Sequence, residues 1–423
     1  MASPRIGKAM TAAIMAGGLA AGVYRAVLAS DHLDTPTVMA DPAADIGDMF
    51  AWMSPDGRRL NMVMDIVGKK FSDQLQYAFH VDSGRRLGPT TATTTIVCRF
   101  DVAQTAECWA GNADYLHGDA SADSGLVGQR RRFRVMAGLR DDPFFNNVRG
   151  ARAMYQVAGA AMQGGARLDG ASCPAFDAAT SRAILDAWRH TDGGPATNFL
   201  AGWTSSAIVV SVDLGLVNAG GSMLAVWGSV RKAPDESPVR SLLESLRGTP
   251  ALPPLGEQIE RDARPLIKNA LVGGPLAGDA DSYRRREAYN RAARTDWARF
   301  AGDIANTLGL YDGLDGDCGS QWLADSTAHP SLRYTALATL LADDRLWVNS
   351  AATTCTQFLA VELAAFHSPD ADPGDCGGRT PTEDASNIFR SLLANGTQRG
   401  VDDGLSRDEK VHSVTTFPFL ASP

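Results

Sequence analysis

The sequence lacks the short motifs that identify several large classes of enzyme. It contains no G-x-S-x-G, no H-E-x-x-H and no phosphate-binding Walker loop. A nucleophile-elbow hydrolase, a zincin and a P-loop nucleotide hydrolase are therefore not indicated. The seven histidines are scattered, and no two are separated by three or four residues. A nucleophile and a base that only folding brings together stay open as an alternative.

The six cysteines include no C-x-x-C pair. This absence argues against a redox motif and against a thiolate zinc knuckle. Six cysteines instead fit an exported protein with three disulfides, for which about 15 pairings exist. Cysteines that flank a hairpin-like turn or a helix and its following loop are the natural partners. The favoured pairs are Cys98–Cys108, Cys355–Cys376 and, by elimination, Cys173–Cys318.

The chain has no excess of basic residues, since 40 Lys and Arg stand against 48 Asp and Glu, for a formal net charge of −8. Nucleic acids and anionic lipid surfaces are bound through excess Lys and Arg, so we expect neither as a partner. An acidic surface is compatible with metal cations. No protein or small-molecule partner is indicated.

After residue 29 no apolar stretch is long enough to span a membrane, which takes ~20 residues. Residues 1–29 themselves are typical of a signal peptide, with a basic start at Arg5 and Lys8, an apolar middle and a small-x-small end at Ala29. No twin arginine precedes the apolar part, and no cysteine follows the predicted cut. We therefore expect a secreted or periplasmic protein; an uncleaved anchor is the alternative.

Residues 30–232 are expected to form a β-rich body, with a helical insertion near 145–200. The predicted strands alternate apolar and polar residues or are continuously apolar; they cover 48–54, 60–67, 75–82, 93–102, 131–139, 206–217 and 223–230. Residues 111–128 are rich in Gly, Asp and Ser and predict a loop. Short connections favour antiparallel pairing. The predicted class is therefore α+β, with an antiparallel β-sandwich-like body.

Residues 233–423 predict a mainly helical region packed on this body, after a proline-rich joint at about 232–256. Apolar residues spaced by three or four mark one face of a helix. The first such stripe comprises Tyr289, Ala293, Trp297, Phe300, Ile304 and Leu308. Three further helices are predicted at about 332–341, 358–366 and 388–393.

The segment from Ser30 to Trp52 has the chain's highest density of potential metal ligands. The predicted ligands are Asp34, Asp41, Asp45 and Asp48, with His32 secondary and Asp141 and Asp142 joining from a distant strand end. Calcium takes about six to eight oxygen ligands and tolerates irregular loops, so Ca²⁺ is the expected ion. The alternative is local capping, because Asp at a turn often bonds its own backbone.

A second metal hypothesis depends on cleavage after Ala29. The new N-terminus would be Ser30-Asp31-His32, and a free amine, two backbone amides and an imidazole would form a square-planar nitrogen set. That geometry suits Cu²⁺. Burial of the N-terminus in the fold would prevent it.

Three other polar groups have structural interpretations. His80 and Asp82 share a strand face, where they could bond each other or a ligand, and a satisfied polar pair is favoured. Arg379 lies in a Gly-rich loop and is expected to pair with an acid such as Asp384 or another acid of the loop, in a structural role. The acids in residues 311–319 lack the register of a helix–loop–helix calcium site and predict a turn.

Several stretches together resemble a secreted bacterial family known as a domain of unknown function, number forty-three thirty-one. The resemblance rests on Ser30, His32 and Pro36, and on the stretches 41–45, 54–57, 137–145, 263–273, 375–381 and 417–423. It implies a β-rich body with helical additions and export, and it implies no reaction. The chain departs from the family where Lys268-Asn269 stands in place of the usual Asn-Glu.

These observations favour a non-enzymatic, cation-stabilised binding or structural module of the cell envelope or exterior. One alternative is a metal-dependent enzyme that uses the same Asp/His cluster. Another is copper capture by a free N-terminus. A cluster that closes around its ion indicates the first, and a cluster that lines an open pocket with a vacant metal position indicates the enzyme.

Overall fold

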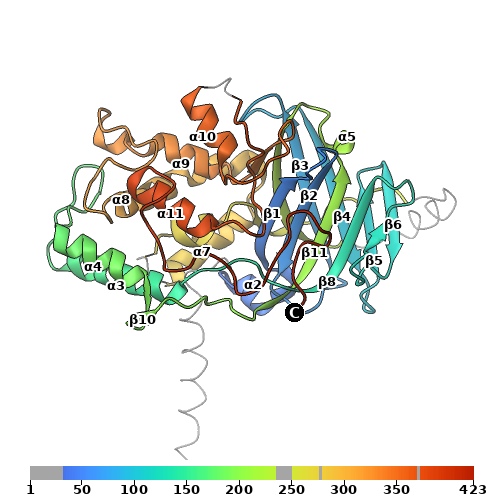
Figure 1. Ribbon diagram of the computed structural model, residues 1–423, viewed down its shortest axis with the longest axis horizontal. Coiled ribbons are helices and arrows are strands. Elements are labelled where there is room, and N and C mark those ends of the chain that lie inside the picture. The colour runs from blue at the N-terminus through green and yellow to red at the C-terminus, as the bar shows by residue number, and fades with distance from the viewer. Residues whose placement is uncertain (1–31, 235–249, 276–278, 369–371) are drawn as a thin grey trace, which may run out of the picture.

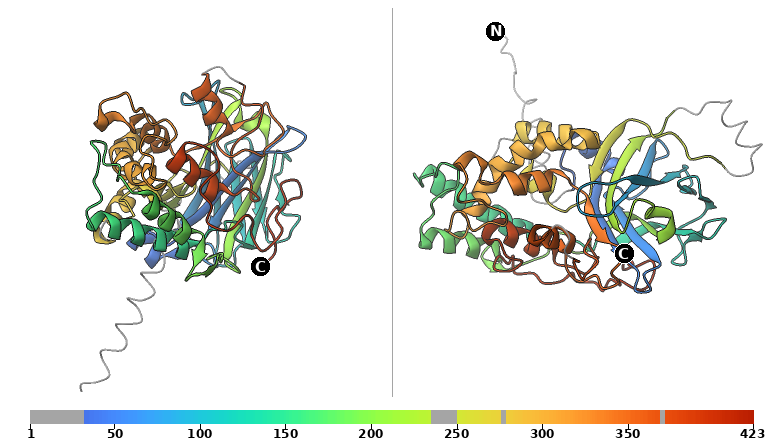
Figure 2. Two further views of the ribbon diagram at one scale, coloured as in Figure 1. Left: turned by 60° about the vertical axis from the view of Figure 1, so that its left-hand side comes forward. Right: turned by 90° about the horizontal axis from the view of Figure 1, so that it is seen from above.

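The structure is a computed structural model, which describes residues 32–234, 250–275, 279–368 and 372–423. The predicted signal peptide and most of the predicted proline-rich joint lie outside the described residues. Strands fill one end of the molecule and helices fill the other (Figure 1). The view from above in Figure 2 shows the same division, and Figure 1 labels β1 as the strand beside the helical part.

The first sheet is antiparallel and has the order β1-β2-β11-β8-β7. Its strands are β1 (Ile46–Met53), β2 (Arg59–Ile66), β11 (Thr204–Asp213), β8 (Phe133–Asp141) and β7 (Leu126–Val127). All eight residues of β1 are buried, because this strand lies between the second sheet and the helical part.

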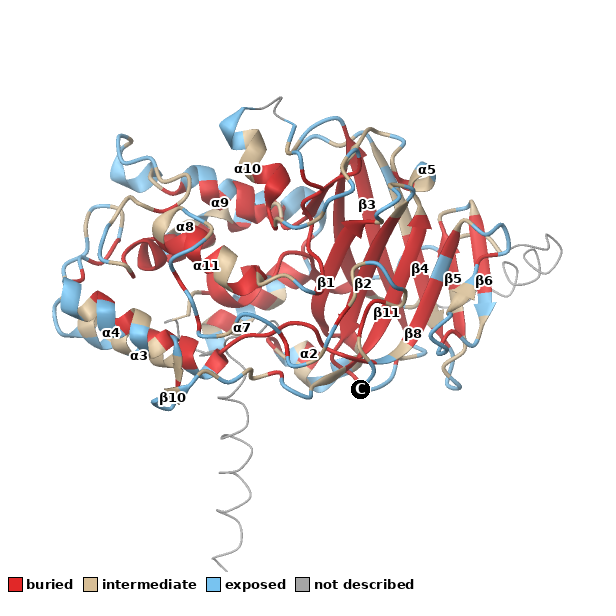
Figure 3. Cartoon of the chain, in the orientation of Figure 1, coloured by how far each residue is buried: buried red, intermediate tan, exposed pale blue. Residues whose placement is uncertain are grey.

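The second sheet has the order β13-β12-β3-β4-β5-β6, and β14 pairs with the other end of β12. Its strands are β3 (Leu75–Gly84), β4 (Ala92–Phe100), β5 (Ala106–Ala110), β6 (Asp114–Gly118), β12 (Met223–Lys232), β13 (Gln258–Asp262) and β14 (Leu346–Asn349). The inner faces of both sheets share one core with the helices (Figure 3). The structure thus confirms the α+β class and the sandwich-like body.

The helical part contains the predicted insertion and most of the chain after β13. Its elements are α2 (Pro36–Ala40), η1 (Pro42–Ala44), α3 (Val148–Gln163), α4 (Ala178–Trp188), η2 (Ile267–Leu271), α7 (Asp279–Asn290), η3 (Arg294–Phe300), α8 (Ala301–Asp312), η4 (Pro330–Leu332), α9 (Thr335–Ala342), α10 (Ala360–His367) and α11 (Ala385–Asn395). The short α5 (Leu214–Val217) and the pair β9 (His190–Thr191) and β10 (Gly194–Pro195) lie at the edges. No helix in the described residues is long and apolar enough to cross a membrane.

The predicted loop at 111–128 is wrong in part, because β6 and β7 lie within it. The β6 strand is short and ends in His117 and Gly118, so its apolar signal is weak. It forms because β5 offers a free edge. The two strands are antiparallel, with Ala110 opposite Asp114 at one end and Ala106 opposite Gly118 at the other.

The stripe from Tyr289 to Leu308 is not one helix but α7, η3 and α8 in succession. In a continuous helix Tyr289 and Trp297 would be about 12 Å apart along the axis. The break at Ala293, whose ψ is 151°, lets both rings contact one guanidinium. The Cζ atom of Arg261 lies 3.5 Å from the Tyr289 ring centroid and 3.9 Å from that of Trp297. This cation–π contact overrides the local helical period.

The structure contains the three favoured disulfides, Cys98–Cys108, Cys173–Cys318 and Cys355–Cys376. The first links β4 to β5 as neighbours in the sheet. The second joins the loop before α4 to the loop after α8, which fixes the helical insertion to the C-terminal helices.

His80 lies on β3 and does not bond Asp82. Its Nε2 lies 2.9 Å from the Ser229 hydroxyl, and its ring stacks on Trp227 at 3.8 Å. Burial and the positive charge of Arg231 lower the pKa of His80 to about 3. Asp82 is paired instead with Arg345, at 3.1 Å. His80 is therefore a neutral core residue at neutral pH.

This environment predicts an acid-sensitive contribution to stability. Below pH 6.5 the unfolded chain protonates His80, while the folded chain does not until about pH 3, so stability falls as pH drops through that window. Between pH 7 and pH 5 the contribution is about 2 kcal/mol. In urea titrations, the free energy of unfolding of the wild type should fall between pH 7 and pH 5 by about 2 kcal/mol more than that of His80→Gln. His117→Gln, at an exposed site on β6, should lose as much stability as the wild type, and equal losses in all three proteins would contradict the assignment.

Candidate metal centre

Two aspartates face each other across the first pair of strands. Ile46 pairs with Ile66 and Asp48 pairs with Asp65, so Gly47 is an extra residue that forms a bulge in β1. The bulge places Asp48 and Asp65 directly opposite each other, and both are buried, at 1% and 0% exposure. Like charges in this position repel each other.

Only one oxygen of each carboxylate is satisfied by the protein. Oδ1 of Asp48 accepts from Nη1 of Arg379 at 2.5 Å, and Oδ1 of Asp65 accepts from the Ser205 hydroxyl at 3.1 Å. Oδ2 of Asp48 and Oδ2 of Asp65 have no hydrogen-bond partner among the described residues. A buried anionic oxygen without a partner is costly, so these two atoms are candidates to bind a cation or to carry a proton.

His32 completes the group from the N-terminal segment. The Leu33 backbone N–H donates to Oδ2 of Asp45 at 2.5 Å, which holds the segment against the start of β1. The imidazole then lies over Gly47, where a Cβ atom would be 2.6 Å from Nε2 of His32. The glycine of the bulge is therefore required for the position of the histidine.

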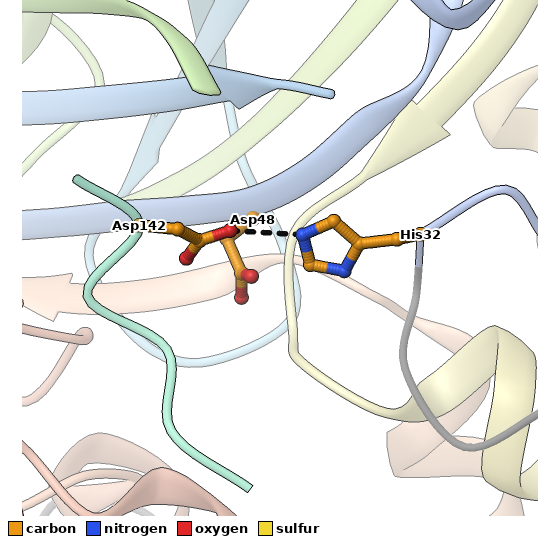
Figure 4. A group of neighbouring side chains, drawn as sticks. All are labelled: His32, Asp48 and Asp142. Atoms are coloured by element: carbon orange, nitrogen blue, oxygen red, sulfur yellow. Dashed lines mark hydrogen bonds and ion pairs between the residues drawn. The ribbon is translucent and has the colours of Figure 1, made fainter. Parts of the chain in front are cut away.

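Asp142 follows β8 and faces the same imidazole. Nε2 of His32 lies 2.8 Å from Oδ2 of Asp142, as Figure 4 shows, with Asp48 beside the same contact. The other oxygen of Asp142 accepts from the Phe144 backbone N–H at 3.0 Å. His32, Asp48 and Asp142 each offer a ligand atom, and these atoms all lie within 4.8 Å of one another.

The pKa values reflect this excess of buried negative charge. Burial raises the pKa of Asp48 to about 7, although Arg379 opposes the change. Burial and the charges of Asp142 and Asp48 raise the pKa of Asp65 well above its ordinary value. For His32 burial lowers the pKa, but the bond to Asp142 and the nearby acids outweigh it and raise the pKa to about 9.

A neighbouring group of acids already contains a cation of the protein. Asp34, Asp45 and Glu260 also bring ligand atoms within 4.8 Å of one another. The Lys268 ammonium lies 2.6 Å from Oε1 of Glu260 and 3.9 Å from Oδ2 of Asp34, with all three side chains fully buried. Nearby acids raise the pKa of Lys268 despite its burial. This ammonium neutralises part of the negative charge of the group.

A third group lies on the opposite side of the β8 end. Adjacent residues of an extended chain point to opposite faces, and Asp141 accordingly faces away from Asp142, toward Asp408 and His412. The Lys410 ammonium lies 3.2 Å from Oδ1 of Asp141. This group too is neutralised in part by lysine. Of the three groups, only the one at His32 contacts no ammonium in the described residues.

The predicted ligands therefore divide among several places. The structure brings His32, Asp48 and Asp142 together, places Asp34 and Asp45 in the Lys268 group, and puts Asp141 with His412. Asp41 is exposed and caps η1 by accepting from the Ala43 N–H at 3.2 Å, which is the capping role considered as the alternative.

The expected partner of Arg379 was wrong. Asp384 caps α11 through the Asn387 N–H, and Arg379 reaches the buried Asp48. The fold carries the loop at 375–381 onto the edge of β1, where Ala51 and Arg379 form an isolated bridge. No local spacing in the sequence records that contact.

Asp65, Glu260 and Lys268 were missed as members of these groups. Asp65 is the one charged residue inside the apolar stretch 60–67, and a lone charge in a buried strand is the signal that was available. Glu260 lies in a short polar stretch with no such contrast, so only the pairing of β13 with β12 reveals its burial.

No protein-family model, no curated protein and no solved structure matches the chain.

The bulge makes a testable prediction about His32. Gly47→Ala places a methyl group where the imidazole lies, and such overpacking costs about 1–3 kcal/mol. Gly302→Ala is a matched control, because its Cβ in α8 would have no heavy atom within 4 Å. The control should be neutral or stabilising by up to about 1 kcal/mol. Equal unfolding free energies for the two variants would contradict the placement of His32.

A second prediction concerns Arg379. Arg379→Met leaves Asp48 with an uncompensated buried charge and should destabilise the metal-free protein by about 3–5 kcal/mol. Asp48→Asn in the same chain removes that charge and should recover part of the loss. Denaturant titrations of the two single variants and the double variant measure the coupling; strictly additive losses would show that the pair does not interact.

Proposed function

We propose that this protein holds one divalent metal ion at His32, Asp48, Asp65 and Asp142, and that the ion stabilises a non-enzymatic structural or binding module. The observations that carry the proposal are the unpartnered Oδ2 atoms of Asp48 and Asp65, which belong to paired residues of two buried strands. The His32 imidazole offers a ligand atom within 4.8 Å of Asp48 and Asp142.

The local charges favour a divalent ion. Asp48, Asp65 and Asp142 supply three negative charges when ionised, and Arg379 supplies one positive charge at Asp48. Two negative charges then remain for the ion when the imidazole is neutral. Metal binding requires deprotonated ligands, so the ion would take the place of the protons that the metal-free site retains.

The ligand types favour a transition metal over calcium. Imidazole suits Zn²⁺ and the other first-row ions, while Ca²⁺ is bound by oxygen alone. One histidine with aspartates is therefore better matched to Zn²⁺, Mn²⁺ or Fe²⁺ than to the Ca²⁺ expected from the acidic segment. Copper capture by a free N-terminus finds no support, since the His32 imidazole is buried against Asp142.

The burial of the group supports a structural role over catalysis. His32 and the acids of the site are between 0% and 2% exposed. A catalytic metal needs an open position for water or substrate, whereas a structural metal is enclosed by its ligands. The ion would join the N-terminal segment to β1, β2 and the end of β8.

Export is part of the proposal. The three disulfides are compatible with an oxidising compartment outside the cytosol. A predicted signal peptide ahead of His32 and the resemblance to a secreted family support the same location.

Metal analysis and melting curves test the proposal directly. The purified protein should contain close to one equivalent of a first-row metal, and removal by a chelator should lower its melting temperature. Zn²⁺ or Mn²⁺ should restore it more effectively than Ca²⁺; an ion at one hundred times its Kd adds about 2.7 kcal/mol. A protein without bound metal, whose melting temperature no ion changes, would refute the site.

Asp65→Asn separates a metal ligand from a merely structural acid. The substitution preserves the shape of Asp65 and, like the protonated carboxyl of the metal-free site, carries no charge, so the metal-free variant should be about as stable as the metal-free wild type. It should lose most of the rise in melting temperature on adding metal. Asp213→Asn, at a partly exposed ion pair on the same sheet, should keep that rise. A destabilised Asp65→Asn that still responds to metal would contradict the proposal.

A further inference from the structure

A cavity of about 850 Å³ lies in the helical part, away from the proposed metal centre. It opens between η3, α9, α10 and the start of β14. Its volume falls in the range of about 300–1,000 Å³ that is typical of small-molecule sites. The apolar part of its wall comprises Leu87, Trp297, Leu332, Leu340, Trp347 and Phe366.

The cavity has a buried floor and an exposed apolar rim. Trp297 and Trp347 are 3% and 1% exposed, whereas Leu332 and Phe366 are 55% and 46% exposed. Leu332 and Phe366 are two of the few large apolar side chains on the described surface. An apolar rim around a hollow of this size indicates a ligand with an apolar body.

One guanidinium in the wall is held only by a long ion pair. The Arg294 side chain makes no hydrogen bond within the described residues, and its Nε atom lies 3.7 Å from Oδ2 of Asp82. That carboxylate is already shared, because Arg345 contacts it at 3.1 Å and the Thr93 hydroxyl donates to it. The Arg294 side chain is 47% exposed, and its donors can reach a ligand in the cavity.

The other charged residues of the wall are already bound. Arg345 donates to both oxygens of Asp343, at 2.7 and 2.6 Å. Arg333 donates to Asp169 at 2.5 Å. Asp325 accepts from two backbone N–H groups and the hydroxyl of its own turn. Nε of Arg333 has no partner but is buried, so Arg294 is the exposed charged group of the wall that is left for a ligand.

A second donor in the wall also lacks a partner. The indole N–H of Trp347 is buried and has no hydrogen-bond partner within the described residues. Nε of Arg333 is a further buried donor of the wall without a partner. Arg294, Trp347 and Arg333 all offer donors, which matches a ligand that accepts hydrogen bonds and carries a negative charge.

From these contacts we infer that the cavity binds a small amphipathic monoanion, with its carboxylate on Arg294 and its apolar body against Trp297, Trp347 and Phe366. The occupant we propose is a linear or aromatic carboxylic acid. A cationic amphiphile would place its charge against Arg294, and a fully polar anion would leave the apolar wall uncovered.

Binding of three probes with the same ten-carbon chain tests the inference. Titration calorimetry and the fluorescence of Trp297 and Trp347 should show saturable binding of decanoate to the intact protein. Decanol should bind at least tenfold more weakly, and decyltrimethylammonium should not bind. No saturable binding of decanoate, or equal binding of all three probes, would overturn the inference.

Three variants locate the site. Arg294→Gln should weaken decanoate binding by about tenfold or more, because a charge-assisted contact is lost, and should leave decanol binding unchanged. Arg299→Gln is the matched control: it lies on the same η3, bonds the Ala288 carbonyl and does not line the cavity.

Ala336→Trp, at an exposed position in the wall, should block decanoate and decanol alike. Equal decanoate affinity in the wild type and Arg294→Gln would refute the assignment of the charge.

Discussion

The repulsion between Asp48 and Asp65 is the constraint on which the N-terminal half of this fold depends. Two carboxylates directly opposite each other on buried strands cannot both be ionised without a nearby positive charge. The bulge at Gly47 creates this arrangement, since a regular register would send Asp48 to the other face of the sheet. Arg379, Ser205 and His32 then gather around the two acids. The core therefore contains negative charge on Asp48 and Asp65 that the surrounding side chains neutralise only in part.

The three acidic groups differ in how they are neutralised. Lys268 and Lys410 place ammonium groups among the acids in two of them. The group at His32 has an imidazole and a guanidinium that binds one oxygen of Asp48. A lysine is a cation that the chain carries itself, so those groups are independent of what the solvent contains. The His32 group must take either protons or a metal from outside, and its stability therefore depends on the surroundings.

The sequence predicted most of the secondary structure, because long apolar strands and stripes at helical spacing carry strong local signals. It also predicted the disulfide pairs and the segment that contains His32 and Asp48. It did not reveal the role of Asp65, which lies within a predicted apolar strand, or of Arg379, which contacts Asp48 across 331 residues of chain. The register of β1 and the loop at 375–381 are set by tertiary packing. The break between α7 and α8 has the same origin, since Arg261 draws Tyr289 and Trp297 together.

The residues around the proposed metal centre come from distant parts of the chain. His32 and Asp142 are separated by 110 residues, and Asp48 meets Arg379 only near the C-terminal end of the fold. A nascent or truncated chain that ends before Arg379 has the acids but not the guanidinium that orients Asp48. Correct coordination would therefore be a late event in folding, and it would distinguish finished molecules from partial ones.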